Sequence, residues 1–191
     1  MNISNAAKHL GPMFEQIAAD GQLALDELRL PHGAQVLDVG TGVGNFAIFL
    51  ALRGFDVLTG EPDTDTTRYA RQDWAGNAAA VGVERGIRFQ HFNAAHMPFE
   101  DGRFAAVFFY GVLHHIDETA RKDVFREALR VARPGGAVVF FEPNPETLKQ
   151  IWVNDPGHPV PADPACYKGN LPVKAMRLQG RRMDISLYRA G

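Results

Sequence analysis

The sequence contains a single cysteine, Cys166, among 191 residues. One cysteine cannot form an internal disulfide, so a disulfide-stapled fold is excluded and a reducing cytoplasm is the expected location. The chain also lacks a bilayer-spanning apolar run, a basic-then-apolar signal segment, internal repeats and low-complexity tracts. Its formal charge of −2 gives no general attraction to nucleic acid, so we expect neither nucleic-acid nor membrane binding.

The chain has the composition of an ordinary globular protein, with 46% hydrophobic and 22% charged residues. At this length we expect one domain over residues 1–191, in which 1–33 form a helical lead-in. Strand-like and helix-like patterns then alternate at 35–39, 44–53, 55–59, about 63–75, 87–91, 104–109, 118–132 and 137–142. This alternation predicts an α/β fold, a parallel sheet with helices on both faces.

Residues 36–44, Val-Leu-Asp-Val-Gly-Thr-Gly-Val-Gly, place a glycine-rich turn between a buried strand and a helix. Glycines there let the backbone bend sharply, and the N–H groups of the following helix suit polar or anionic ligand atoms. Glu61 ends the next strand, where an α/β nucleotide site places the carboxylate that binds a ribose. The arrangement predicts a nucleoside-like cofactor. The alternative for Glu61 is a role in capping a helix that starts near Asp63.

The spacing of the glycines distinguishes between cofactors. A dinucleotide fingerprint reads G-x-G-x-x-G, but here position 45 is asparagine and the third glycine is Gly44. Asp38 lies inside the strand, where its carboxylate would repel a pyrophosphate and would suit a cofactor with an α-ammonium group. The spacing therefore disfavours NAD, and an ordinary strand-to-helix turn is the alternative without a ligand.

Four further segments follow the glycine turn in a fixed order, at 55–63, 88–99, 104–116 and 129–142. Together the five segments resemble the class I S-adenosylmethionine-dependent methyltransferases, and most of all their small-molecule, type 11-like branch. The resemblance implies a Rossmann-like, seven-stranded, mostly parallel sheet with an antiparallel last strand, completed by strands at 173–178 and 183–189. It also implies S-adenosylmethionine as cofactor, S-adenosylhomocysteine as product, and methyl transfer to a small-molecule acceptor by in-line displacement.

The resemblance also implies a cofactor site, residue by residue. Asp38, Gly40 and Gly42 would hold the methionine portion, and Glu61 would bind the ribose. Asn93 replaces the family's usual aspartate at the adenine edge, where its carbonyl oxygen can still accept from the adenine amino group. The remaining residues of the expected cofactor site are neighbours of these along the chain, together with one residue near the sulfonium: Val39, Thr41, Gly44, Pro62, Ala94, Ala95 and Tyr110.

The acceptor side is expected around the end of the fourth strand. His114 and His115 follow that strand and are the catalytic candidates, as general base or as hydrogen-bond partner, with His115 favoured. Adjacent side chains diverge, so we expect only one of them to face the acceptor, and packing is the alternative for both. Residues 144–172 are proline-rich and are expected to form a lid. The expected acceptor contacts are His9, Phe14, Tyr110 and Trp152.

Several alternatives stay open at this point. The side chains of Asp155, His158, Asp163 and Cys166 could be metal ligands, but their spacing matches no established zinc pattern, so we expect no metal. The same cofactor could serve aminopropyl transfer, although the acidic polyamine pocket of such enzymes is not evident. A cofactor-binding module without turnover and a nicotinamide oxidoreductase are the other two alternatives. The sequence indicates neither the acceptor, nor its nucleophilic atom, nor the oligomeric state.

Overall fold

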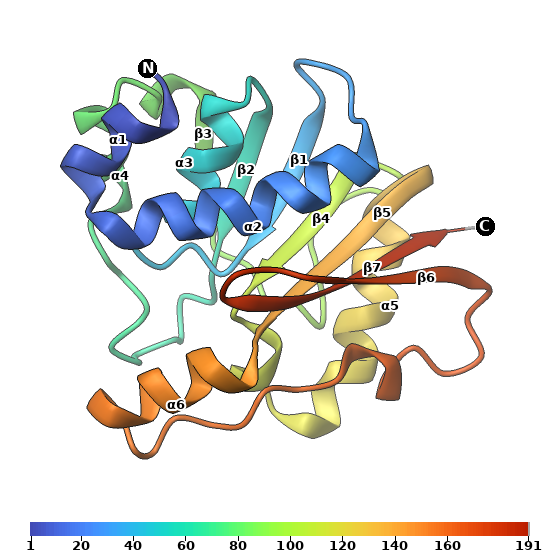
Figure 1. Cartoon of the computed structure of the whole chain (residues 1–191). Helices are drawn as coiled ribbons and strands as arrows, with labels where there is room; N and C mark the ends of the chain where they lie inside the picture. The colour runs from blue at the N-terminus through green and yellow to red at the C-terminus, as the bar shows by residue number, and fades with distance from the viewer. Residues whose placement is uncertain (191) are drawn as a thin grey trace.

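The structure, a computed structural model, describes residues 1–190 and is built around a seven-stranded sheet (Figure 1). The strand order is β3-β2-β1-β4-β5-β7-β6, so the chain reverses its direction of strand addition between β1 and β4. Strands β1 to β5 are parallel, whereas β7 runs antiparallel between β5 and β6. The strands are β1 Gln35–Val39, β2 Asp56–Gly60, β3 Ile87–Phe89, β4 Phe104–Tyr110, β5 Ala132–Pro143, β6 Val173–Gln179 and β7 Met183–Ala190.

Helices cover both faces of this sheet (Figure 1). Side chains of α2 and α3 pack on one face, and side chains of α5 pack on the other. The α-helices are α1 Ile3–Leu10, α2 Pro12–Leu28, α3 Asn45–Leu52, α4 Trp74–Ala80, α5 Arg121–Val131 and α6 Pro145–Asn154. The short 3-10 turns are η1 Glu84–Gly86, η2 Leu113–His115, η3 Glu118–Ala120 and η4 Pro164–Cys166. The predicted fold class is confirmed.

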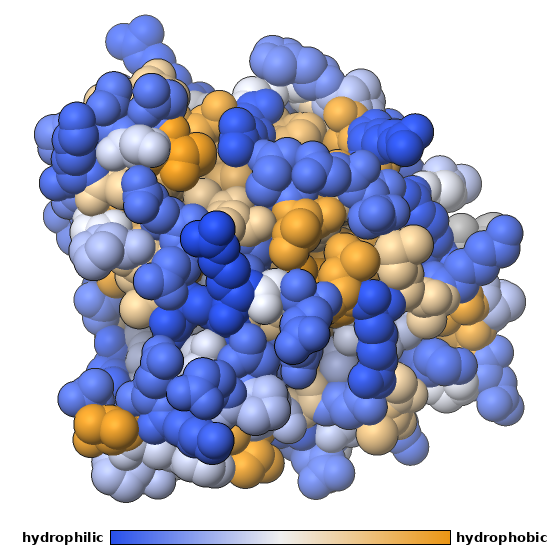
Figure 2. All heavy atoms as spheres, viewed as in Figure 1, coloured by the Kyte–Doolittle hydropathy of each residue, from blue (hydrophilic) through white to orange (hydrophobic). Residues whose placement is uncertain are grey.

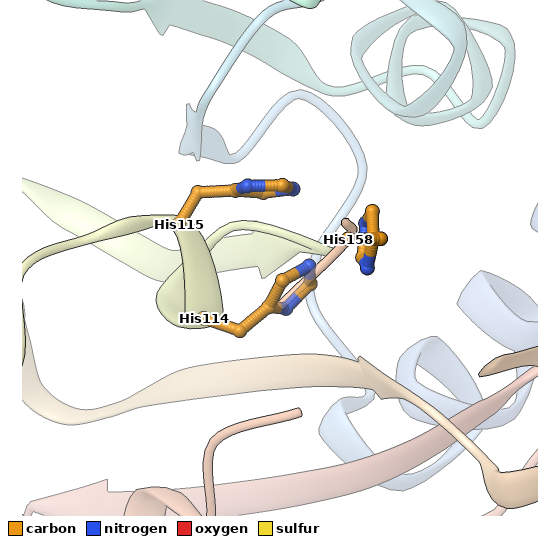
Figure 3. A group of neighbouring side chains, drawn as sticks. All are labelled: His114, His115 and His158. Atoms are coloured by element: carbon orange, nitrogen blue, oxygen red, sulfur yellow. The ribbon is translucent and has the colours of Figure 1, made fainter. Parts of the chain in front are cut away.

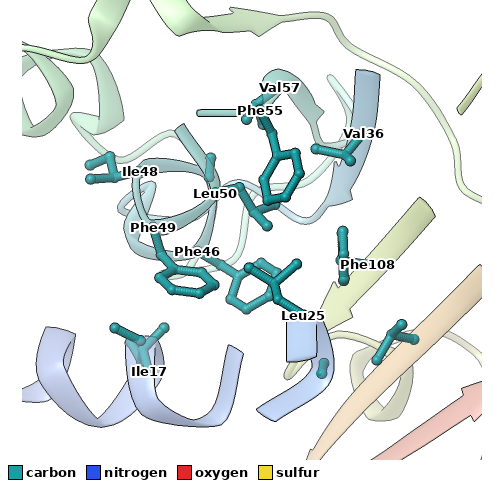
Figure 4. Close-up of a cluster of buried hydrophobic side chains, with 14 of the residues drawn as sticks. Ile17, Leu25, Val36, Phe46, Ile48, Phe49, Leu50, Phe55, Val57 and Phe108 are labelled. Carbon is teal, nitrogen blue, oxygen red and sulfur yellow. The ribbon is translucent and has the colours of Figure 1, made fainter. Parts of the chain in front are cut away.

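The two faces have separate hydrophobic cores because side chains alternate along each strand. In β4, Phe108 belongs to the core under α2 and α3, whereas Phe109 belongs to the core under α5. Figure 4 shows the first of these cores, where Phe49 of α3 faces Ile17 of α2 and Phe46 lies beside Leu25. Burying each phenylalanine contributes roughly 1.5–3 kcal/mol, so aromatic residues on α3 fix the helix that follows the glycine turn.

The helix predicted over about 63–75 is wrong. Residues 62–73 are irregular, and α4 begins only at Trp74, with the Asp73 carboxylate accepting from Gly76 N. Within the irregular segment, Asp65 Oδ1 accepts from Thr67 N at 2.8 Å. Side chains that bond to their own backbone in this way stabilise turns at the expense of helix. The segment therefore stays an extended loop beside the carboxyl end of β2.

Three segments differ in detail from the expectation: the helical lead-in, the fifth strand and residues 144–172. The helical lead-in is two helices, α1 and α2, which meet at Gly11 with φ of 87°. The fifth strand begins at Ala132, before its expected start at 137. Residues 144–172 comprise α6, an irregular stretch and η4, and they follow directly from the carboxyl end of β5. In Figure 1 α6 lies below the sheet, on the same side as the loop 62–73.

The surface in Figure 2 mixes hydrophilic side chains with small, separate groups of hydrophobic ones. Scattered exposed hydrophobic residues of this kind are normal for a globular protein. Within residues 1–190 no helix combines the length and the apolarity needed to cross a bilayer.

Candidate functional site

A large cavity of about 1090 Å³ opens at the carboxyl ends of β1, β2 and β4. This is the place where the strand order reverses, and parallel α/β sheets bind their ligands in the crevice there. The walls come from the glycine turn, the loop 62–72, residues 92–96, the segment 110–117, α2 and α6. The expected cofactor residues that line it are Val39, Gly40, Thr41, Gly42, Glu61, Pro62, Asn93, Ala94, Ala95 and Tyr110.

The glycines of the turn have different tasks. Gly40 and Gly42 have φ of 86° and 49°, a region that side-chain-bearing residues rarely adopt. A Cβ on Gly40 would also lie 2.5 Å from Val112 Cγ2, so this glycine lets the end of β4 approach the turn. Gly44 does not line the cavity. It precedes α3, where a Cβ would lie 2.8 Å from Trp74 Cβ, and its role is close packing rather than ligand contact.

Glu61 lines the cavity and is only 7% exposed. Its Oε2 accepts from Gly42 N at 3.2 Å, and its Oε1 accepts from Arg71 N at 2.7 Å. The carboxylate thus joins the glycine turn to the loop 62–72. The alternative role as a helix cap is excluded, because the next helix begins at Trp74.

Asp38 lies behind the cavity wall instead of in it. The side chain is 1% exposed, and Oδ2 accepts from Thr59 Oγ1 at 2.8 Å. Because that bond uses the only hydroxyl hydrogen of Thr59, Thr41 is the donor in the 2.9 Å contact between the two threonine hydroxyls. Asp38 Oδ1 is buried without a partner within residues 1–190. Burial raises the pKa of Asp38 to about 7, with Thr59 opposing the change and the Glu61 carboxylate adding to it.

Two more cofactor candidates have restricted side chains. Asn93 Oδ1 accepts from Ala95 N at 2.8 Å, so the oxygen expected to serve an adenine already holds the turn 93–95. Tyr110 stacks on Phe46 with ring centroids 4.9 Å apart, and its buried Oη has no partner in the described chain. Burial raises the pKa of Tyr110, and the nearby Asp20 carboxylate raises it further.

His114 and His115 both face the cavity, which corrects the expectation that adjacent side chains diverge. They lie in η2, and the tight turn brings their ring centroids to 4.3 Å (Figure 3). His114 is buried, and its Nδ1–H donates to Glu142 Oε2 at 2.7 Å. Desolvation by surrounding side chains, together with the nearby His114 and His158, lowers the pKa of His115 to about 4, although the residue is exposed.

His158 completes this group from a segment far along the chain. Its ring centroid lies 5.0 Å from those of both His114 and His115 (Figure 3). Burial lowers the pKa of His158, and the nearby His114 lowers it further. Its Nδ1–H donates to Pro159 O at 2.9 Å, and Trp152 Nε1–H donates to His158 O at 2.9 Å. No periodicity in the sequence links His158 to the other two, since the chain passes through β5 and α6 between them.

Three of the expected acceptor contacts lie elsewhere. Phe14 is fully buried in the core under α2, so its neighbours Met13 and Ile17 line the cavity instead. His9 is exposed on α1 outside the cavity lining. Trp152 is 38% exposed and holds the backbone at 158, while Thr147 and Ile151 are the residues of α6 that line the cavity. Of the four residues, only Tyr110 lines the cavity.

The remaining candidate metal ligands are separated from His158 by their own contacts. Asp155 Oδ2 accepts from Tyr69 Oη at 2.7 Å, which links the segment after α6 to the loop 62–72 across the cavity. Asp163 forms an ion pair with Arg177, with 2.7 Å between Oδ1 and Nη2. Cys166 is exposed in η4. Within the described residues these three side chains therefore do not form one ligand group with His158, the alternative that the sequence had left open.

Comparison with known proteins gives consistent results. The family described as "Methyltransferase domain" matches residues 37–140. An uncharacterized methyltransferase of Mycobacterium sp. (strain KMS) is 37% identical over 109 residues, which are 57% of this chain and 38% of that protein. The ubiquinone/menaquinone biosynthesis C-methyltransferase UbiE of Desulfotalea psychrophila is 31% identical over 124 residues, 64% of this chain and 46% of that protein. The chain thus spans less than half the length of these relatives.

The fold also has solved counterparts. The crystal structure of a SAM-dependent methyltransferase from Aquifex aeolicus superposes with a TM-score of 0.64 at 17% identity, and the match covers 100% of both chains. At this identity the likeness supports the fold.

The buried Asp38 predicts a specific pH dependence of stability. Its pKa is raised in the folded chain, so the folded state holds the proton more tightly than the unfolded state. The contribution to the free energy of unfolding is full below the ordinary value of 3.8 and is lost as pH rises through about 7. We expect the Asp38→Asn variant to lack this loss, so that its stability relative to the wild type increases over that interval. Urea unfolding at several pH values measures the difference, and parallel pH profiles of the two chains would contradict the prediction.

Proposed function

The chain belongs to the methyltransferase domain family, and we propose that it transfers the methyl group of S-adenosylmethionine to a small-molecule acceptor. The observation that carries the proposal is the single cavity in which the glycine turn, the buried Glu61 carboxylate and the η2 histidines meet. S-adenosylmethionine is the cofactor of this family. The relatives are longer than this chain, so the activity of the whole protein is part of the proposal as well.

The residues present fit this cofactor. Gly40 carries no side chain beside Val112, so the methionine portion can approach the main chain of the turn closely. Glu61 has a second lone pair on each oxygen beyond those that the backbone uses, and these can accept from two ribose hydroxyls. Tyr110 also lines this cavity, although its unpartnered Oη is buried.

The adenine and methionine ends of the proposed cofactor are held differently. Ala94 and Ala95 would border the adenine, with Asn93 contributing its amide nitrogen because its oxygen is engaged. Asp38 would act from behind the wall, through Thr59 and Thr41, as a negative group near the α-ammonium. Gly44 would have no direct part, since its position is required for packing against Trp74.

The proposed reaction is an in-line displacement. An acceptor lone pair attacks the methyl carbon, and the bonding electrons return to the sulfonium sulfur, which leaves as a thioether. The protein's task is to align the three atoms and exclude water, so no invariant base is needed. The acceptor would lie between the η2 histidines and the apolar side chains of Met13, Ile17 and Ile151. This apolar lining and the printed name of the Desulfotalea relative both support a small, partly apolar acceptor.

Replacement of Glu61 tests the cofactor site. The Glu61→Ala variant loses charge-assisted hydrogen bonds to the ribose, so its affinity for S-adenosylhomocysteine falls by roughly 1.5–3 kcal/mol, about 10- to 150-fold. Glu61→Gln keeps the size of the side chain and removes its charge, so an intermediate loss is expected. Asp63→Ala, at an exposed position two residues away, is the matched control and keeps the wild-type affinity. Calorimetric titration measures all three, and an unchanged affinity in folded Glu61→Ala would rule out the ribose role.

The segment 144–172 is proposed to close over the acceptor. Its link to the opposite wall is the hydrogen bond from Tyr69 Oη to Asp155 Oδ2. Amide exchange in 144–172 is expected to slow when S-adenosylhomocysteine binds. Tyr69→Phe removes one exposed hydrogen bond of about 0.5–1.5 kcal/mol, so exchange in this segment accelerates roughly 2- to 12-fold. Strand β7 serves as the internal control, and equal exchange in all states would make the segment a static surface.

A labelled cofactor tests the methyl transfer itself. The chain is incubated with S-adenosylmethionine carrying a labelled methyl group and a metabolite extract, and the molecule that gains the label is identified. With that acceptor, single-turnover rates of His114→Ala and His115→Ala are expected to fall by ~10²–10⁴ if the acceptor gives up a proton. His9→Ala, on α1 and outside the cavity, keeps the wild-type rate. Binding of the cofactor without any labelled product would instead support a module without turnover.

A further inference from the structure

Three imidazoles converge on one wall of the cavity (Figure 3). His114 and His115 extend from η2, and His158 reaches them from the segment that follows α6. One ring nitrogen of each lies within 4.8 Å of the other two. Among the described residues this is the only such group of three potential metal-ligand side chains.

Two of the rings are oriented by hydrogen bonds from Nδ1. His114 Nδ1–H donates to Glu142 Oε2, and His158 Nδ1–H donates to Pro159 O. In the neutral ring, the other nitrogen, Nε2, then presents a lone pair. The His114 side chain is 1% exposed, and its Nε2 has no partner within residues 1–190. A buried lone pair without a partner costs free energy unless a ligand takes it.

We propose that His114, His115 and His158 bind a divalent transition-metal ion of the zinc type, with its fourth coordination position open to the cavity. Imidazole nitrogen is a preferred ligand of Zn²⁺, and three protein ligands with one open position are typical of reactive zinc sites. The Glu142 carboxylate on the far nitrogen of His114 is the second partner that metal-binding histidines usually have. The site replaces the expectation of no metal, which rested on ligand spacing along the sequence.

The geometry allows this coordination with small movements. Zn–N bonds of about 2.05 Å in a tetrahedral site place the nitrogens roughly 3.3 Å apart. From a separation of up to 4.8 Å, the nitrogens of His115 and His158 must each approach that of His114 by about 1.5 Å, which rotations about their side-chain torsions can supply. The exposed His115 and the surface segment that carries His158 have room to move, whereas Glu142 fixes His114. Glu142 itself is held by Ala162 N, which donates to Oε2 at 2.9 Å.

The surrounding charges suit a cation. The carboxylates of Asp65 and Asp155 interact electrostatically with His115, and the Glu142 carboxylate accepts a hydrogen bond from His114. Two arginines oppose them: Arg68 lies 3.6 Å from Asp155, and Arg121 Nη2 donates to His114 O at 3.3 Å. The three carboxylates outnumber the two guanidinium groups, so a divalent ion would meet a net negative environment.

The fourth position gives the ion a role in the proposed function, on which this step rests. A hydroxyl or thiol of the acceptor that binds there loses its proton to water more readily, as zinc-bound water does. The ion would thereby prepare the acceptor oxygen or sulfur for attack on the methyl carbon, with the electrons of the broken carbon–sulfur bond returning to the cofactor sulfur. Metal binding uses the same lone pairs that a general base would use, so the histidines act through the ion when it is bound.

A zinc titration tests the site. The chain, without a histidine tag and after treatment with a chelator, is titrated with ZnCl2 by calorimetry, and Co²⁺ is added in parallel to record visible bands of four-coordinate cobalt. One saturable site is expected. His115→Ala and His158→Ala are each expected to weaken zinc binding more than 100-fold, and Glu142→Gln to weaken it about 10- to 100-fold. His96→Ala, a histidine of the same cavity outside the group, is the matched control and binds zinc like the wild type.

Three other results would each overturn the proposed metal site. It fails if the wild type shows no saturable zinc binding, if His115→Ala and His158→Ala bind zinc as the wild type does, or if His96→Ala loses as much. Titration of the same samples with S-adenosylhomocysteine separates the two proposals. Zinc binding without S-adenosylhomocysteine binding would overturn the methyltransferase function alone, and the reverse would overturn the metal site alone.

Discussion

The hydrogen bond from Gly42 N to Glu61 Oε2 joins the ends of β1 and β2, and the organisation of the cavity depends on it. The two strands remain paired as far as Gly40 N, which donates to Gly60 O at 2.8 Å. Beyond that point the chains separate, and the carboxylate bridges them while also accepting from Arg71 N. One side chain therefore fixes the glycine turn, the end of β2 and the loop 62–72 together. A ligand that binds Glu61 meets three walls whose positions are already set.

The opposite side of the cavity is formed by the segment after β4 and by the end of β5. The strand order reverses so that β4 lies next to β1. The turn η2, which follows β4, therefore lies beside the glycine turn, which follows β1. Val112 packs where a Cβ of Gly40 would lie, which brings His114 and His115 close to the turn. Glu142, near the end of β5, then fixes His114 through Nδ1. The two strand ends thus supply one wall, and the segment after α6 adds the buried His158.

The sequence predicts the parts of this structure that follow local patterns. Apolar runs ending in glycine or acid mark β1 and β2, and so the positions of Gly40 and Glu61 follow from them. The loop 62–73 is not predictable in this way, because bonds such as that from Thr67 N to Asp65 compete with a helical pattern. Phe14 shows a second limit, since periodicity tells which face of α2 is apolar but not which residue borders a cavity. The histidine group shows a third, because His158 joins it only through tertiary structure.

The proposed function requires the cavity to hold a nucleoside with a methionine portion and not a dinucleotide. Calorimetric titration of the wild-type chain with S-adenosylhomocysteine and, separately, with NAD tests this most directly. Saturable binding of S-adenosylhomocysteine at one site per chain, with no heat from NAD under the same conditions, is the predicted result. Binding of NAD together with an absence of S-adenosylhomocysteine binding would overturn the proposed function.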